Sequence, residues 1–283
     1  MKSIKKVCVA GAGNMGKQIA LNTALAGFEV SVITSKPEAN AEWCRTFMEK
    51  GVTKGKYSGE ARDETLSRVT FYTSAGDAVG DCDLVIESII EDEALKRGFF
   101  IEANQYAKPD TIITSNSSYI PSSTFAGIIT NPGRLANLHY FNPVMSMKLV
   151  EIVVGPHTDR ETIESLKNFV EITGKQSIIV HKEIEGFVVN RLLRAVQDEA
   201  YFLYGSGVAS FEDIDIAAEK GLNYPMGPFR LVDFTGIDIN YFNRQRKFEQ
   251  TGKEDDRPPA FLAEKYEKGE YGKKTGKGLY TYD

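Results

Sequence analysis

A glycine-rich turn near the start of the chain constrains its fold more than any other feature. The apolar run at residues 7–10 leads directly into the sequence GAGNMG at residues 11–16, and a helical pattern follows until Gly27. Glycines at this spacing, between a strand and a helix, permit a tight turn, close approach of the backbone to a pyrophosphate, and close helix–strand packing. We therefore expect a dinucleotide at the start of this helix. The residues expected to contact it are Gly11, Gly13, Asn14, Met15 and Gly16.

The residues after the second predicted strand, a β-rich run that follows Gly27 and ends near Thr34, bear on which dinucleotide binds. A site of this kind usually has Asp or Glu here, which binds the hydroxyls of the adenosine ribose. This chain has Thr34, Ser35 and Lys36 instead. Two hydroxyls and an ammonium can accept a 2′-phosphate, so these residues favour NADP(H) over NAD(H). The alternative is a solvated corner in an enzyme that uses NAD(H) with a weakened ribose contact.

The remaining pattern predicts an α/β protein with two domains. Short β-rich runs alternate with helical stretches, which is typical of a mostly parallel, Rossmann-type sheet. We expect strands within residues 69–72, 83–88, 111–115, 134–141, 148–154 and 177–180. Residues 36–68 are polar and lysine-rich and are expected to form a helical excursion from the sheet. A long helix at 185–207 begins an all-α region, so we place a dinucleotide-binding domain at 1–184 and a helical C-terminal domain at 185–283.

Composition and charge argue against several classes of partner. The net charge is −5, so no broad basic face is available for nucleic acid. No apolar run approaches the ~20 residues that a membrane span requires. Cys8, Cys44 and Cys82 have neither metal-site spacing nor the even number of a disulfide framework, which suits a reducing compartment. We expect a cytoplasmic protein with no metal.

The segment LHYFNPVMSMKLVEIV, residues 138–153, contains a candidate catalytic pair. Asn142-Pro143 is a turn signal, so the chain can reverse there and bring two strand-like pieces side by side. Glu151 can then accept a hydrogen bond from one imidazole nitrogen of His139, which leaves the other nitrogen for a substrate proton. Hydride transfer to or from a nicotinamide needs such a proton acceptor or donor. A lone histidine can also be structural, and the glycine turn upstream favours the catalytic interpretation.

Together, these motifs resemble the 3-hydroxyacyl-CoA dehydrogenase family, and most closely its bacterial 3-hydroxybutyryl-CoA dehydrogenases. The resemblance runs from VCVAGAGNMG to GKKTGKGLYTYD. LHYFNPVMSMKLVEIV resembles the family's H-F-F-N-P-x-x-x-M-K-L-V-E segment, and SNSS at 115–118 resembles S-N-T-S-S. The segments EGFVVNRLL, YPMGPF and KKTGKGLY also match. The resemblance implies a helical C-terminal domain that mediates dimerisation and closes over the site.

The resemblance also implies roles for individual residues. Ser118 would bind the 3-oxygen of the substrate and Asn190 would orient its acyl group, next to a dyad of His139 and Glu151. Further contacts to the dinucleotide are implied for Glu91, Lys96 and Asn116. Contacts to the CoA phosphates are implied for Lys50 and Lys54. Without the resemblance, the serine would be interpreted as a loop hydroxyl, the asparagine as a helix-start residue and the two lysines as a solvated face.

We therefore expect an NAD(P)-dependent enzyme that forms a homodimer and interconverts short-chain (S)-3-hydroxyacyl-CoA and 3-oxoacyl-CoA. Two departures from the family pattern bear on this expectation: Thr34 replaces the usual Asp, and residues 35–49 form a shorter, less typical stretch. One alternative is a dehydrogenase of a free hydroxy acid, of the sugar-acid or carnitine type, against which Lys50 and Lys54 argue. A second is a non-catalytic nucleotide-binding or structural protein, against which the full set of site residues argues.

Overall fold

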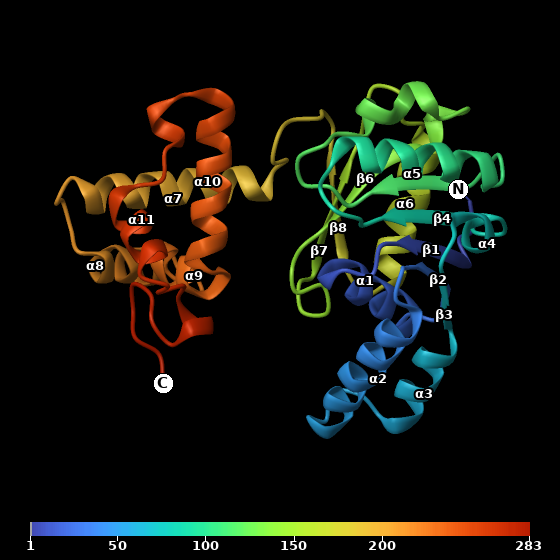
Figure 1. The fold of residues 1–283 in the computed structure, drawn as a ribbon, viewed down its shortest axis with the longest axis horizontal. Coiled ribbons are helices and arrows are strands. Elements are labelled where there is room, and N and C mark those ends of the chain that lie inside the picture. The colour runs from blue at the N-terminus through green and yellow to red at the C-terminus, as the bar shows by residue number, and fades with distance from the viewer. Residues whose placement is uncertain (1) are drawn as a thin grey trace. The chain divides into compact units, whose positions relative to one another are not determined.

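The computed structural model describes residues 2–283, which form two compact units that divide between Val188 and Val189. The first unit contains an eight-stranded sheet with helices on both faces (Figure 1). The second unit consists of helices and turns. The predicted fold class, a mostly parallel Rossmann-type domain followed by an all-α domain, is confirmed.

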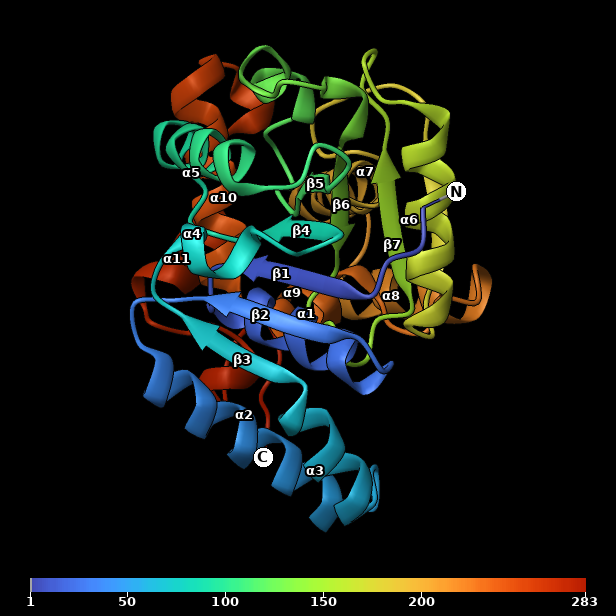
Figure 2. The same ribbon diagram turned by 90° about the vertical axis from the view of Figure 1, so that its right-hand side faces the viewer.

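The strands of the sheet follow the order β3-β2-β1-β4-β5-β6-β7-β8. Figure 2 shows this order from β3 to β7. Their bounds are β1 Lys6–Ala10, β2 Glu29–Ile33, β3 Val69–Tyr72, β4 Leu84–Glu87, β5 Ile112–Ser115, β6 Leu135–Tyr140, β7 Leu149–Val153 and β8 Gln176–Val180. Strands β1 to β6 are parallel, β7 is antiparallel to β6, and β8 is parallel to β7. Because the carboxyl ends of parallel strands share one edge of a sheet, the loops that follow β1, β2, β4, β5 and β6 lie along that edge.

Two apolar clusters pack helices onto opposite faces of the sheet. One includes Ile19 and Phe169 from the helices and the alternate residues Val7 and Val9 of β1. In the other, Phe100 and Phe125 pack together with ring centroids 4.5 Å apart. The helices of the first face are α1 (Asn14–Leu25) and α6 (Arg160–Ile172). Those of the second are α4 (Ala75–Val79), α5 (Glu93–Tyr106) and η1 (Ser122–Ile128), and η2 (Pro132–Arg134) precedes β6.

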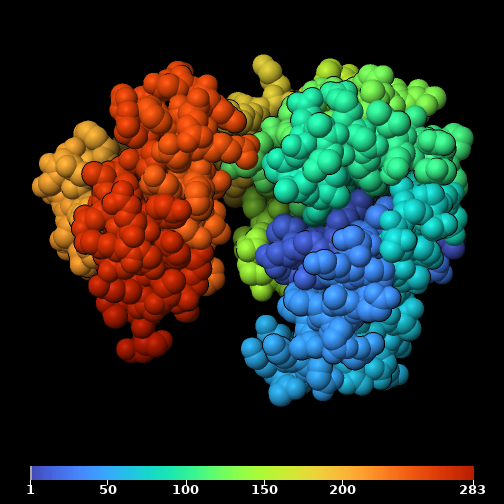
Figure 3. All heavy atoms as spheres, viewed as in Figure 1, coloured from blue at the N-terminus to red at the C-terminus, as the bar shows by residue number. Residues whose placement is uncertain are grey.

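The predicted helical excursion forms a lobe beyond β3, made of α2 (Pro37–Thr53) and α3 (Gly59–Ser67) (Figure 2). Figure 3 shows the atoms of this lobe at the lower end of the first unit. Its small apolar cluster is centred on Cys44 and Met48, which pack with Leu66 of α3 and with Leu21 of α1. The lobe therefore packs against α1 and adds no strand to the sheet.

The second unit is built around an aromatic cluster that includes Tyr201, Phe229 and Phe261. Its elements are α7 (Val189–Gly205), α8 (Phe211–Ile216), η3 (Ala217–Gly221), α9 (Pro228–Thr235), α10 (Ile237–Thr251), η4 (Glu254–Asp256), α11 (Ala260–Glu267) and η5 (Lys273–Thr275). The helix expected from residue 185 begins four residues later, because Gly186 and Phe187 have φ angles of 76° and 49°, outside the helical region. No helix within residues 2–283 has the length and apolar character needed to cross a membrane.

Candidate active site

The turn between β1 and α1 fits the pyrophosphate of a dinucleotide. Gly11 has a φ of 98°, and a Cβ there would lie 2.5 Å from the carbonyl oxygen of Ser88. A Cβ on Gly16 would lie 1.8 Å from the carbonyl oxygen of Gly11. At Gly13, the N-cap of α1, the space is open, with nothing within 4 Å of a Cβ. Two glycines thus permit close backbone packing, and the third leaves the positive end of the helix accessible to an anion.

Asn14 and Met15, which follow in the same turn, differ in their surroundings. Asn14 is exposed and its Nδ2 donates to Oδ1 of Asn142, 3.1 Å away in the loop after β6. Met15 is half-buried and packs against the core of the sheet. A side-chain hydrogen bond therefore connects the glycine turn to the loop that follows the candidate catalytic strand.

The corner after β2 presents donors to solvent. The hydroxyl of Thr34 accepts hydrogen bonds from Nδ2 of Asn40 (2.8 Å) and from the backbone N–H of Lys36 (3.2 Å). Since both contacts use the oxygen as acceptor, the Thr34 O–H remains able to donate to a ligand. Ser35 and Lys36 are exposed. The first turn of α2 has no side-chain cap and contains one carboxylate, that of Glu38.

His139 and Glu151 meet across the antiparallel pair β6–β7, where they are directly opposite in register. Nδ1 of His139 lies 2.7 Å from Oε2 of Glu151, and Nε2 lies 2.9 Å from Oγ of Ser118. The imidazole is 3% exposed and the carboxylate 0%. A carboxylate that only accepts hydrogen bonds keeps a proton on Nδ1 of the imidazole. Nε2, which faces the serine, is therefore the nitrogen that can gain or lose a proton.

Residues just before the second unit complete the surroundings of this pair. The backbone N–H of Val188 donates to Oε1 of Glu151 at 3.0 Å, so both carboxylate oxygens have a partner. The rings of Phe141 and Phe187 lie edge-on to the imidazole, with centroids 4.7 and 5.4 Å away. Sequence reasoning missed Phe187 and Val188, because their placement depends on a turn inside a segment with helical periodicity.

Asn116 anchors the loop that carries Ser118. Its backbone N–H donates to the carbonyl oxygen of Glu87 (2.8 Å), and its Oδ1 accepts from the N–H of Tyr140 (2.8 Å). Its side-chain amide thus lies between the ends of β4 and β6, at the carboxyl edge of the sheet. The glycine turn and residues 34–36, which follow β2, lie at the same edge.

Lys96 lies in a buried ionic network on α5. It is 1% exposed, and its Nζ is 2.5 Å from Oε1 of Glu87 and 3.2 Å from Oε2 of Glu91. Glu87 also accepts from the hydroxyl of Ser115 at 2.6 Å, and Ser117 donates to Glu91. Of the three charged groups, only that of Glu91 has appreciable exposure, 28% of its side chain. Sequence reasoning missed Glu87, although a carboxylate at the end of an apolar strand is a usable signal.

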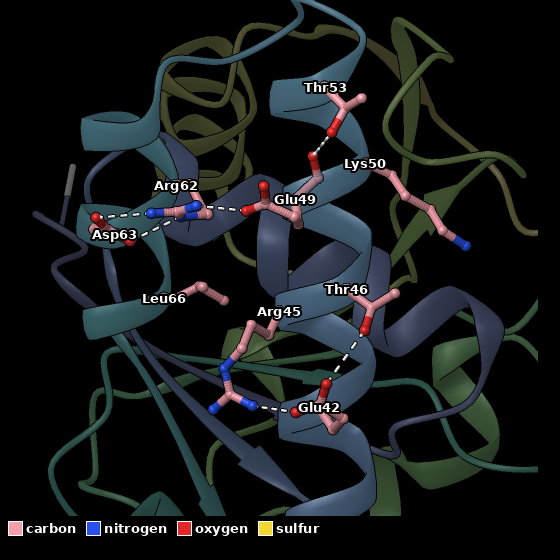
Figure 4. Close-up of a pocket in the computed structure, with 9 residues that line it drawn as sticks. All are labelled: Glu42, Arg45, Thr46, Glu49, Lys50, Thr53, Arg62, Asp63 and Leu66. Atoms are coloured by element: carbon pink, nitrogen blue, oxygen red, sulfur yellow. Dashed lines mark hydrogen bonds and ion pairs between the residues drawn. The ribbon is translucent and has the colours of Figure 1, made fainter.

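Lys50 and Lys54 lie apart from this edge, on the α2–α3 lobe. Both are exposed. A groove between the two helices has a volume of about 640 Å³ and contains ion pairs of Arg62 with Glu49 and Asp63. Figure 4 shows the Lys50 side chain pointing away from these pairs. The lysines therefore do not meet the dyad, which lies on β6 and β7, several strands away from β3.

Asn190, the fourth residue with an implied catalytic role, belongs to the second unit. It is the second residue of α7 and is half-buried. Within residues 2–283, no group of three or more His, Cys, Asp or Glu side chains is arranged to hold a metal ion. Cys8, Cys44 and Cys82 are free and buried.

A doubly wound sheet with an open glycine turn, and an acid–base pair at the same sheet edge, defines a dinucleotide-dependent oxidoreductase. The comparisons with known proteins agree. The family model for the NAD-binding domain of 3-hydroxyacyl-CoA dehydrogenase matches residues 6–184, and the model for its C-terminal domain matches residues 186–282. The chain belongs to the 3-hydroxyacyl-CoA dehydrogenase family.

Individual relatives are similar over the whole chain. A 3-hydroxybutyryl-CoA dehydrogenase of Bradyrhizobium diazoefficiens is 37% identical over 282 residues, which cover 99% of this chain and 96% of the relative. The crystal structure of Mycobacterium tuberculosis FadB2 matches with a TM-score of 0.88 at 37% identity and covers 100% of both chains. A diketoreductase that acts on dicarbonyl compounds matches with a TM-score of 0.90 at 30% identity, also over 100% of both chains. The predictions of the family and of a hydroxyacyl-CoA dehydrogenase activity with a nicotinamide cofactor are confirmed.

Proposed function

We propose that this enzyme interconverts short-chain (S)-3-hydroxyacyl-CoA and 3-oxoacyl-CoA, with acetoacetyl-CoA and 3-hydroxybutyryl-CoA as the preferred pair. The observation that carries the proposal is the series of contacts from the buried Glu151 through the buried His139 to the half-buried Ser118. Such a series supplies a proton at one defined atom, Nε2, which is what reduction of a ketone beside a nicotinamide requires.

The bound nicotinamide would supply or accept the hydride, and residues of the chain would manage the proton. In the reducing direction, the imidazolium of His139 donates a proton from Nε2 to the substrate 3-oxygen as negative charge develops there. Glu151 stabilises the positive charge of the ring before this transfer and keeps the ring oriented. Ser118, whose Oγ lies 2.9 Å from Nε2, donates its own O–H to the same substrate oxygen. Asn190 orients the acyl group, as the family resemblance implies.

The preference for NADP(H) over NAD(H) is part of the proposal. Its support is the corner after β2, where Thr34, Ser35 and Lys36 offer hydroxyls and an ammonium and where no carboxylate ends the strand. The contact from Asn40 leaves the Thr34 O–H as a donor, which suits a phosphate oxygen. The remaining dinucleotide contacts that we propose come from the glycine turn, Asn116 and the Glu91–Lys96 pair.

Lys50 and Lys54 are proposed to bind the phosphates of CoA. Both ammonium groups are exposed, and they are four residues apart at the end of α2, so they lie on one side of the helix. Exposed ammonium groups attract a polyanion without a fixed geometry. The length preference for short acyl chains rests on the family resemblance alone.

A homodimer in the cytoplasm completes the proposal. The second unit exposes large apolar side chains, among them Leu192, Phe202, Leu222 and Phe242. Such residues are typical of surfaces that are covered in an assembly. The three free thiols fit a reducing compartment. Multi-angle light scattering on the purified chain would test the dimer.

Steady-state kinetics would test the reaction. We expect turnover of acetoacetyl-CoA to exceed that of free acetoacetate by at least tenfold in kcat/KM, and NADPH to be preferred over NADH. Each of the four substrate–cofactor pairs would be followed at 340 nm. Equal turnover of acetoacetyl-CoA and acetoacetate would contradict the CoA requirement.

The resemblance to a diketoreductase favours one alternative, a reductase of a small carbonyl compound without CoA. The same dyad would serve it, and Lys50 and Lys54 would then have no role. A higher kcat/KM for a free dicarbonyl compound than for acetoacetyl-CoA would select this alternative.

A further inference from the structure

A buried asparagine holds the loop that carries Ser118 against β6. The loop, residues 116–121, is irregular and connects β5 to η1. Asn137 is 0% exposed, and its Nδ2 donates to the carbonyl oxygen of Ile120 at 3.0 Å. Its Oδ1 accepts from the N–H of Ser122 at 2.7 Å. One side chain therefore holds the backbone two and four residues after Ser118.

Asn137 also belongs to the strand of the candidate catalytic histidine. It precedes His139 by two residues on β6, so the two side chains project from the same face of the strand. Oγ of Ser118 lies 2.9 Å from Nε2 of His139. The asparagine thus joins both partners of this contact, since its backbone is part of the histidine strand and its side chain binds the serine loop.

Ser118 has a second anchor on its other side. There, Oδ1 of Asn116 accepts from the N–H of Tyr140, the residue after His139. Asn116 is also proposed to contact the dinucleotide, so its replacement would disturb two functions at once. Asn137 has no exposed surface, so any effect on the reaction must pass through the residues that it holds.

We propose that Asn137 is a positioning residue that keeps the Ser118 hydroxyl within hydrogen-bond reach of His139 and of the substrate 3-oxygen. The inference rests on the proposed roles of Ser118 and His139. A displacement of about 1 Å in such a group can lower the rate by about 10²-fold. An amide side chain suits the task because it provides a donor for the Ile120 carbonyl and an acceptor for the Ser122 N–H, which an aliphatic residue would leave unpaired.

A double-mutant cycle between Asn137→Ala and Ser118→Ala tests the proposal. Asn137→Ala should lower kcat by about 10- to 100-fold. In the Ser118→Ala background it should lower kcat by no more than about twofold, because the group that it positions is already absent. Binding of NADPH, measured by fluorescence, should be unchanged in all variants, which also shows that they are folded. If kcat of the double variant falls by the product of the two single-variant factors, the two residues act independently and the proposal is overturned.

A matched control comes from an asparagine that holds a loop before β6. Nδ2 of Asn104 donates to Oγ1 of Thr130 (3.0 Å). Its Oδ1 accepts from the N–H of Thr130 (3.0 Å) and from Nη2 of Arg134 (2.7 Å). Asn104→Ala should lower Tm and leave kcat within about twofold of the parent. A kcat loss as large as that of Asn137→Ala would show that general loosening explains both, and the proposal would fail.

The isosteric variant Asn137→Asp covers the case in which the alanine variant does not fold. It keeps an acceptor for Ser122 and loses the donor to Ile120, so kcat should fall and the loss should again vanish in the Ser118→Ala background. The proposed function is tested separately: a His139→Ala variant with full activity would defeat it. An inactive His139→Ala variant with multiplicative losses in the Asn137 cycle would defeat only the present inference.

Discussion

His139 and Lys50 belong to the same unit, yet their side chains are held in different ways. The imidazole is 3% exposed, and both of its nitrogens lie within hydrogen-bond distance of a partner. The lysine extends from an exposed helix surface, away from the ion pairs of the α2–α3 groove (Figure 4). Proton transfer requires a fixed distance between two atoms, whereas attraction of a polyanion requires only charge within reach. Substitutions in the two regions should therefore differ in size and in the kinetic constant affected.

The largest effect is expected for His139→Ala. Loss of the proton donor should lower kcat by about 10²–10⁴-fold, the usual contribution of general acid–base catalysis. Binding of NADPH should persist, because the glycine turn is untouched. Stopped-flow or steady-state absorbance at 340 nm measures the first quantity, and fluorescence titration the second. His181→Ala, which replaces an exposed histidine, serves as the control and should retain parental kcat.

Glu151→Gln should have the next largest effect. Oε2 faces Nδ1 of His139 and Oε1 accepts from the N–H of Val188. An amide has one acceptor oxygen, so one of these two contacts must be lost and its donor left unpaired. We expect kcat to fall by about 10²-fold and the free energy of unfolding to fall by about 1–3 kcal/mol. Parental kcat in a stable Glu151→Gln variant would show that the carboxylate has no part in proton transfer.

The parts of the site that could be predicted are those formed by residues close to one another in the sequence. The pairing of His139 with Glu151 follows from a turn signal at Asn142-Pro143 between two β-rich runs, and β6 and β7 pair in that way. Gly11 and Gly16 were likewise predictable, because the contacts that exclude a Cβ there arise within a single strand–turn–helix unit.

Other parts of the site depend on contacts between distant segments. Lys96 lies on a helix with several polar residues, and periodicity alone does not reveal that it is buried against Glu87, which comes from β4. Asn137 receives its role from a loop that precedes it by fifteen residues or more. Phe187 lies in a segment with helical periodicity, and only its left-handed backbone turns its ring toward the imidazole.

Thr34→Asp should produce a smaller effect that is confined to cofactor choice. A carboxylate near a 2′-phosphate would be repulsive, and at a partly exposed position this should lower kcat/KM for NADPH about 10-fold relative to NADH. The neutral control Thr34→Val removes the hydroxyl without adding charge and should shift the ratio less. Kinetics with both cofactors at fixed acetoacetyl-CoA give the ratio. An unchanged ratio in Thr34→Asp would remove the basis for the NADP(H) preference.

The smallest effects are expected for Lys50→Ala and Lys54→Ala, which replace exposed charges. Each should raise KM for acetoacetyl-CoA about two- to fivefold, as loss of an exposed ion pair does, and leave kcat unchanged. Because exposed charges are screened over about 10 Å at 0.1 M salt, added salt should raise KM more in the parent than in the double variant. Lys5→Ala, which removes an exposed lysine before β1, is the matched control and should leave KM unchanged. A fall in kcat without a change in KM would place these lysines with the fixed geometry of the dyad, and the contrast between the two regions would be wrong.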